Sequence, residues 1–161
     1  MPGRALRYQG WVDTPDLDVV RDWAALAGGN LAVALSDEAF RRAARAQLSP
    51  FAAPAFHTEA EGSVFEYFGG RREGVDGLIE GWRTMTGRYE SFYVDVVSTD
   101  PLAGGRVLVP LDIRFRPAGG AETRIEAAGL FTLEGGRIAR LQMFGRRSEA
   151  LAAAGIVPAE G

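Results

Sequence analysis

The sequence predicts an α+β protein in which helices come first and a curved antiparallel sheet follows and wraps over them. Apolar residues recur at helical spacing through residues 13–48 and again over 72–87. From residue 90 onward the apolar period changes to two, in four consecutive segments joined by connections rich in Gly and Pro. Helices followed by a run of antiparallel strands are typical of an α+β fold, with the sheet packed on the helices.

Residues 13–30 predict the first helix. Asp13 or Thr14 can cap its start and Pro15 suits its first turn, while Gly28, Gly29 and Asn30 end it. A second helical region begins near residue 31, with Ser36–Asp37 as a fresh cap for residues 38–48. Ser49–Pro50 stops it. A short strand over residues 55–60 precedes a third helix over residues 72–87, whose apolar face comprises Val75, Leu78, Ile79, Trp82 and Met85.

Four strands are predicted over residues 90–98, 105–117, 122–133 and 137–145. Residues 134–136, Glu-Gly-Gly, favour a hairpin between the last two. Residues 146–156 predict a short closing helix or tail. No repeat, linker or low-complexity segment interrupts this order, so the sequence predicts one domain over 1–161, with an N-terminal arm (1–14) and the fold over 15–156.

Composition and charge exclude several classes of function. The net charge of −3 and the pI near 5.3 argue against nucleic-acid binding, which needs a basic surface. The chain has no Cys, and all 18 basic residues are Arg, so thiolate and lysine Schiff-base chemistry are excluded. One His cannot form a multi-His metal site, and no glycine-rich nucleotide motif occurs. The sequence therefore predicts no cofactor.

No stretch of about 18 apolar residues occurs, and the first residues lack the apolar core of a signal peptide. The sequence thus predicts a cytoplasmic protein with no membrane contact.

Five segments carry a resemblance to the SnoaL-like, nuclear transport factor 2-like superfamily, which includes ketosteroid isomerases and polyketide cyclases. They are "GGN" (28–30), "FHTEA" (56–60), "GGRREGVDGLIEGW" (69–82), "LFTLEGGRIARLQMF" (130–144) and "RRSEALAAAGI" (146–156). The resemblance spans about residues 15–156, although residues 35–50 look inserted. It implies a cone-shaped curved sheet around the helices, a mostly apolar pocket for an apolar small molecule, and a homodimer formed through the outer face of the sheet. Activities in the superfamily include isomerisation, cyclisation and epoxide hydrolysis, and many members only bind.

Two of the superfamily's catalytic patterns are incomplete here. The steroid-isomerase pattern requires a carboxylate base, a tyrosine and a second acid that stays protonated. Ketosteroid isomerase is a well-known example of two carboxyl groups whose pKa values differ in this way. The corresponding positions hold His57 or Thr58, Trp23 and Ala128. The epoxide-hydrolase pattern requires two aspartates and an arginine. Asp112 and Arg114 share one strand face, but the last strand offers no second aspartate. The other interpretation of this pair is a solvent-exposed ion pair.

His57 is the strongest single candidate for acid–base chemistry. Histidine is the side chain best suited to accept and return a proton at neutral pH, and Glu59, on the same strand face, can orient the ring. Glu126 is a second candidate because apolar and small residues surround it in the sequence. The alternatives are a hydrogen-bonded wall residue for His57 and a surface charge for Glu126.

The resemblance implies that several aromatic residues line the pocket, where they would suit a flat apolar ligand. They are Trp23, Phe56, Phe65, Tyr67, Trp82, Phe131 and Phe144. Phe65, Tyr67 and Phe68 also fall in a long loop that could form a lid, whereas any one of these residues could instead be core.

Three functional hypotheses follow. The first is a cofactor-free enzyme that cyclises or isomerises an apolar polyketide-like molecule, with His57 as acid or base and Glu59, Asp112, Arg114 or Glu126 assisting. The second is a non-catalytic binding or dimerisation module. The third is an epoxide hydrolase or cyclase that uses Asp112 and Arg114.

Overall fold

The fold was obtained as a computed structural model, which describes residues 14–26 and 28–156. Five α-helices lie in this part of the chain: α2 (Thr14–Ala25), α3 (Leu31–Ala34), α4 (Glu38–Leu48), α5 (Gly74–Thr86) and α6 (Arg147–Ala153). Two 3-10 helices, η1 (Ser49–Phe51) and η2 (Ser63–Phe68), flank the first strand. Apart from Thr14, the N-terminal arm predicted over 1–14 lies outside the described residues.

The strands are β1 (Ala52–Glu61), β2 (Arg71–Glu73), β3 (Ser91–Val96), β4 (Asp100–Leu102), β5 (Arg106–Arg116), β6 (Thr123–Glu134) and β7 (Arg137–Phe144). They form one sheet in the order β2-β1-β7-β6-β5-β3. Strand β4 pairs with the first three residues of β5, Arg106–Leu108. All these pairings are antiparallel except that of β1 with β7, which is parallel. The four strands predicted after residue 90 are confirmed as β3, β5, β6 and β7.

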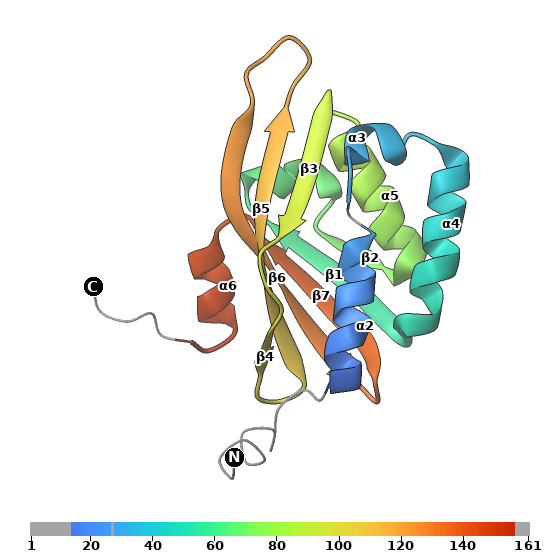
Figure 1. Ribbon diagram of the computed structural model, residues 1–161, viewed down its shortest axis with the longest axis vertical. Helices are drawn as coiled ribbons and strands as arrows, with labels where there is room; N and C mark the ends of the chain where they lie inside the picture. Colours follow the sequence, from blue (N-terminus) through green and yellow to red (C-terminus); the bar gives the residue numbers. More distant parts are fainter. Residues whose placement is uncertain (1–13, 27, 157–161) are drawn as a thin grey trace.

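The sheet separates two layers of helices (Figure 1). Helices α2, α3, α4 and α5 cover its inner face, and α6 lies against its outer face. The larger hydrophobic cluster fills the inner side. A smaller cluster, made of Leu108, Ala128, Leu130, Phe144, Ala150 and Ala154, lies between the sheet and α6. The predicted α+β architecture with a curved sheet wrapped on helices is confirmed.

Local sequence signals explain where the helices begin. Asp37 caps α4, because its Oδ1 accepts a hydrogen bond from the amide of Ala39 at 2.9 Å. Asn30 caps α3 through Ala32 (3.1 Å), and the same oxygen accepts from the amide of Phe92 at 3.0 Å. The residue that ends the first predicted helix therefore also ties α3 to strand β3.

Strands β2 and β4 and the 3-10 helices η1 and η2 were not predicted from the sequence. Strands β2 and β4 are three residues each, and η2 forms where a long loop was expected. In η2, Phe65 and Phe68 are fully buried, so the expectation of a lid is wrong for these two side chains. Strands this short carry too few residues for a period to be recognised, and their pairing with β1 and β5 depends on the fold.

Candidate functional site

A cavity of about 120 Å³ lies between the helices and the inner face of the sheet. It is lined from α2, α3, α4, α5 and from strands β3, β5, β6 and β7. The described lining residues are Trp23, Ala24, Leu26, Leu31, Leu35, Phe40, Ala44, Leu48, Leu78, Ile79, Trp82, Val94, Val96, Val109, Leu111, Gly129, Phe131, Leu141 and Met143. Every one of these side chains is apolar or aromatic, and the only polar side-chain atoms among them are the two indole N–H groups.

Aromatic packing fixes the two tryptophans in the cavity wall. The ring of Trp23 meets Phe56 edge-on at 5.3 Å between centroids. The ring of Trp82 meets Phe65 at 6.3 Å and Phe92 at 6.0 Å, both edge-on. Such edge-to-face pairs are favourable, and they restrict ring rotation. The indoles therefore present rigid, flat surfaces to the cavity.

The structure places three of the seven predicted pocket aromatics in the lining: Trp23, Trp82 and Phe131. Phe56 and Phe65 lie directly behind the two indoles. The placements expected for Tyr67 and Phe144 are wrong. Tyr67 is 39% exposed beneath the guanidinium of Arg88, and Phe144 packs under α6 on the outer face, because alternation along β7 sends it away from the cavity.

Helix α4 supplies lining residues that the sequence interpretation missed. Phe40, Ala44 and Leu48 recur every four residues along one helix face and reach the cavity. Because this segment looks like an insertion relative to the family pattern, the sequence alone assigns no role to its apolar face. The four-residue spacing was the signal that could have identified it.

His57 and Glu59 lie on the outer face of β1, opposite to the cavity. Strand alternation directs the intervening residue, Thr58, and its neighbour Phe56 to the inner face, where both are buried. In the parallel register of β1 and β7, His57 lies beside Arg140, while Thr58 lies beside the cavity-lining Leu141. Neither His57 nor Glu59 is among the described residues that line the cavity.

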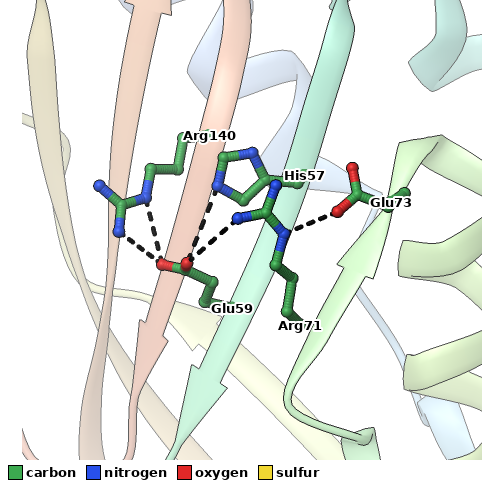
Figure 2. Close-up of polar contacts among 5 residues, drawn as sticks. All are labelled: His57, Glu59, Arg71, Glu73 and Arg140. Atoms are coloured by element: carbon green, nitrogen blue, oxygen red, sulfur yellow. Dashed lines mark hydrogen bonds and ion pairs between the residues drawn. The ribbon is translucent and has the colours of Figure 1, made fainter.

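The two residues instead belong to a charged cluster on strands β1, β2 and β7 (Figure 2). Arg140 donates two hydrogen bonds to one oxygen of Glu59, at 2.6 and 3.1 Å. The other oxygen of Glu59 lies 3.9 Å from both His57 Nε2 and Arg71 Nη1. Arg71 also donates to Glu73 at 2.6 Å, and this hydrogen bond lowers the pKa of Glu73 below its ordinary value.

The other candidate charges also lie on the outer face. Asp112 and Arg114 share that face, as alternation predicted, but they do not pair with each other in the structure. Asp112 accepts from Arg147 at 3.3 Å. Arg114 lies 3.6 Å from Asp95 and stacks on Tyr93. Glu126, 76% exposed, lies 3.9 Å from Arg147. The sheet separates all three residues from the cavity, and the catalytic roles assigned to them and to His57 and Glu59 stay predictions.

Thr58 is the one described buried side chain with a polar atom that lacks a hydrogen-bond partner. Its Oγ1 is fully buried on the inner face of β1. A buried, unpaired hydroxyl costs free energy because its hydration is not replaced.

We expect Thr58→Val, which keeps the shape and removes the hydroxyl, to raise the free energy of unfolding by about 1 kcal/mol. Urea denaturation of both proteins measures this. Thr58→Ser, which keeps the hydroxyl and loses the methyl group, serves as the matched control and is expected to lower stability. A loss of stability in Thr58→Val would mean that the hydroxyl is hydrogen-bonded in the native protein.

No helix among the described residues is both long enough and apolar enough to cross a membrane. No three His, Asp or Glu side chains within residues 14–26 and 28–156 are grouped so that they could hold a metal ion.

Comparisons with protein families and with solved structures indicate the same fold for this chain. The model of the SnoaL-like domain matches residues 38–141. None of the functionally curated proteins matches the chain in sequence. Among solved structures, an NTF2-like protein of unknown function from Burkholderia pseudomallei is 17% identical, with a TM-score of 0.62 over 88% of this chain and 98% of that one.

Two other similar structures come from proteins with a stated activity. A candidate SnoaL-like polyketide cyclase from Jannaschia is 16% identical, with a TM-score of 0.57 over 91% of this chain and 96% of that one. An epoxide hydrolase of the LEH-like type from Mycobacterium tuberculosis is 15% identical, with a TM-score of 0.54 over 88% of this chain and 90% of that one. At these identities the likeness establishes the NTF2-like fold alone.

Proposed function

The chain belongs to the SnoaL-like domain family, and from that premise we propose that it binds one small, neutral, apolar molecule containing a ring in the cavity between its helices and its sheet. The observation that carries this proposal is the cavity itself, with its wholly apolar and aromatic lining. An apolar lining of this kind favours an apolar guest, because it offers water too few hydrogen bonds.

The volume of the cavity limits the size of the ligand. Cavities that enclose drug-sized ligands measure about 300–1,000 Å³, whereas an engineered apolar cavity of about 150 Å³ binds benzene. A volume of about 120 Å³ therefore suits a single ring with few substituents. A fused polycyclic ligand would require the cavity to expand, by displacement of side chains such as Phe40 or Leu141.

Binding is favoured over acid–base catalysis because of where the charges lie. A cyclase or isomerase needs a titratable group within hydrogen-bond reach of its substrate. The described lining of the cavity has none, and His57 and Glu59 face the other side of the sheet. The epoxide-hydrolase hypothesis meets the same obstacle, since Asp112 and Arg114 lie on the outer face and pair with other residues.

The test is ligand-induced stabilisation of the purified protein. We expect benzene or toluene to raise the unfolding midpoint and to change the tryptophan fluorescence, because Trp23 and Trp82 line the site. Benzoate, of similar shape but charged, is expected to have no effect, since the cavity offers no partner for its carboxylate. Failure of every neutral ring compound to stabilise the protein would contradict the proposal.

Two variants test whether the ligand binds in this cavity. Gly129→Ala adds a methyl group inside the cavity, where the new Cβ would meet only the flexible end of Leu141 at 3.3 Å and the ring of Phe131 at 3.6 Å among side chains. We expect it to weaken toluene binding severalfold while the protein stays folded. His57→Gln, on the opposite face, is the matched control and should leave binding unchanged. An effect of His57→Gln larger than that of Gly129→Ala would mean that the ligand binds on the outer face near His57 and not in the cavity.

A further inference from the structure

The wall of the cavity is not equally closed on all sides. Most of its lining residues are buried, but Val96, at the end of β3, is 40% exposed. Ala24 on α2, Phe40 on α4 and Trp82 on α5 also line the cavity and are half-buried. The lining therefore approaches solvent at two places, between α2 and the end of β3 and between α4 and α5.

The gap between α4 and α5 is the better closed of the two. Its half-buried lining residues, Phe40 and Trp82, are both large aromatics, and two phenylalanine rings hold Trp82 edge-on. Arg45 of α4 also forms an ion pair with Asp76 of α5. A neutral apolar molecule that passed here would have to displace a packed aromatic ring next to a pair of charges.

The gap between α2 and β3 is bordered by the smaller side chains of Ala24 and Val96. In Figure 1 the end of β3 and its connection to β4 run beside α2. Arg21 Nε donates a hydrogen bond to Thr99 Oγ1 at 3.2 Å and so joins the two sides. Arg21 precedes Ala24 by three residues on one helix face, and Thr99 follows Val96 by three residues. The hydrogen bond therefore spans the gap next to its apolar border.

The contact between Arg21 and Thr99 is the one hydrogen bond that a side chain of α2 makes with another element, within residues 14–26 and 28–156. The side chain of Arg21 is 55% exposed and also lies 3.5 Å from Asp18 on its own helix. An exposed hydrogen bond of this kind contributes little net free energy, because water replaces it readily. It can break and reform while α2 stays packed through the buried Val20 and Trp23.

We propose that the apolar ligand enters and leaves the cavity between α2 and the end of β3, and that the Arg21–Thr99 hydrogen bond is a strap that closes this entrance. The inference rests on the ligand binding proposed above and adds the route to the cavity. Neither Arg21 nor Thr99 is among the described lining residues, so the strap controls the rate of ligand exchange and not the affinity. Entry and exit both require the same opening.

Stopped-flow tryptophan fluorescence with toluene measures both rates, because Trp23 and Trp82 line the cavity. Thr99→Val keeps the shape of the side chain and removes the hydroxyl that accepts from Arg21. We expect the association and dissociation rate constants to rise together, about two- to fivefold, while the dissociation constant changes by less than about twofold. Unchanged rates in this variant would overturn the proposal.

Thr99→Asp tests the strap in the opposite direction. Its carboxylate would form an ion pair with Arg21, which should slow both rates about two- to fivefold at low salt. High salt screens such an exposed pair, so the rates should recover there. Thr99→Asn, of similar size but uncharged, is the matched control and should show no such dependence on salt. An Asp variant that exchanges toluene as fast as the wild-type protein at low salt would contradict the strap.

Two further variants separate the route from other effects. Asp76→Asn breaks the ion pair between α4 and α5 and should leave both rates unchanged. If it speeds exchange and Thr99→Val does not, the ligand passes between α4 and α5 and the proposal is wrong. Gly129→Ala, inside the cavity, should raise mainly the dissociation rate constant, because it changes the fit of bound toluene and not the entrance.

Acrylamide quenching of tryptophan fluorescence tests the entrance without any ligand. The chain has three Trp residues, and Trp11→Phe leaves only Trp23 and Trp82, both in the cavity wall. In that background Thr99→Val should raise the quenching rate constant and Thr99→Asp should lower it. If quenching shifts in this way but toluene does not bind, the proposed function fails and the entrance stands. If toluene binds but neither exchange nor quenching responds to Thr99, the entrance is wrong and the binding stands.

Discussion

Replacing Gly62 with Ala is expected to lower the free energy of unfolding by about 2–6 kcal/mol, through backbone strain and a steric clash together. Gly62 has φ +112° and ψ 157°, a conformation that residues with a Cβ essentially never adopt. An added Cβ would also lie 2.9 Å from the Cα of Gly145. That neighbour is backbone and cannot move aside as a side chain can. Urea denaturation of the variant measures the loss.

The matched control for this prediction is Gly70→Ala. Gly70 also has a positive φ, +70°, but no atom lies within 4 Å of the position of an added Cβ. It should cost only about 1–2 kcal/mol, the strain of a left-handed residue. Equal losses at the two positions would show that contact between the turn after β1 and the end of β7 contributes nothing. That contact includes the hydrogen bond from the amide of Gly145 to the carbonyl of Glu61.

Replacing Phe68 with Ala is expected to cost about 3–5 kcal/mol, the usual loss for a large buried aromatic side chain. Phe68 is fully buried, and its ring lies so close to α5 that a Cβ on Gly81 would come within 2.5 Å of it. Its carbonyl also accepts a hydrogen bond from Arg72 at 2.6 Å. The unfolding midpoint in urea measures the effect.

Tyr67→Ala, one residue away in η2, provides the comparison. Tyr67 is 39% exposed, and the guanidinium of Arg88 lies 3.9 Å from the centroid of its ring. Such an exposed cation–π contact contributes about 0.5–1 kcal/mol. If the two substitutions cost the same, η2 would be a mobile lid and not part of the core.

Much of the architecture could be predicted from the sequence, because the signals that specify it are local. The Asp37 cap, the glycines after the first helix and the change of period near residue 90 each act over a few residues. Alternation also correctly grouped His57 with Glu59 and Asp112 with Arg114 on common strand faces. Strands β2 and β4 and the inward packing of η2 could not be predicted, since these elements depend on partners distant in sequence.

The sequence by itself therefore determined the order of the elements, the α+β class and which residues share a face. Only the tertiary structure decided which face is the inner one. Helix α6 buries apolar side chains such as Leu130 and Phe144 on the outer face, so both faces of the sheet carry apolar residues and apolarity does not mark the cavity side. Neighbouring residues of a strand point to opposite faces. The face that packs against helices α2–α5 therefore decides that His57 points away from the cavity and that Thr58 lies on the cavity side.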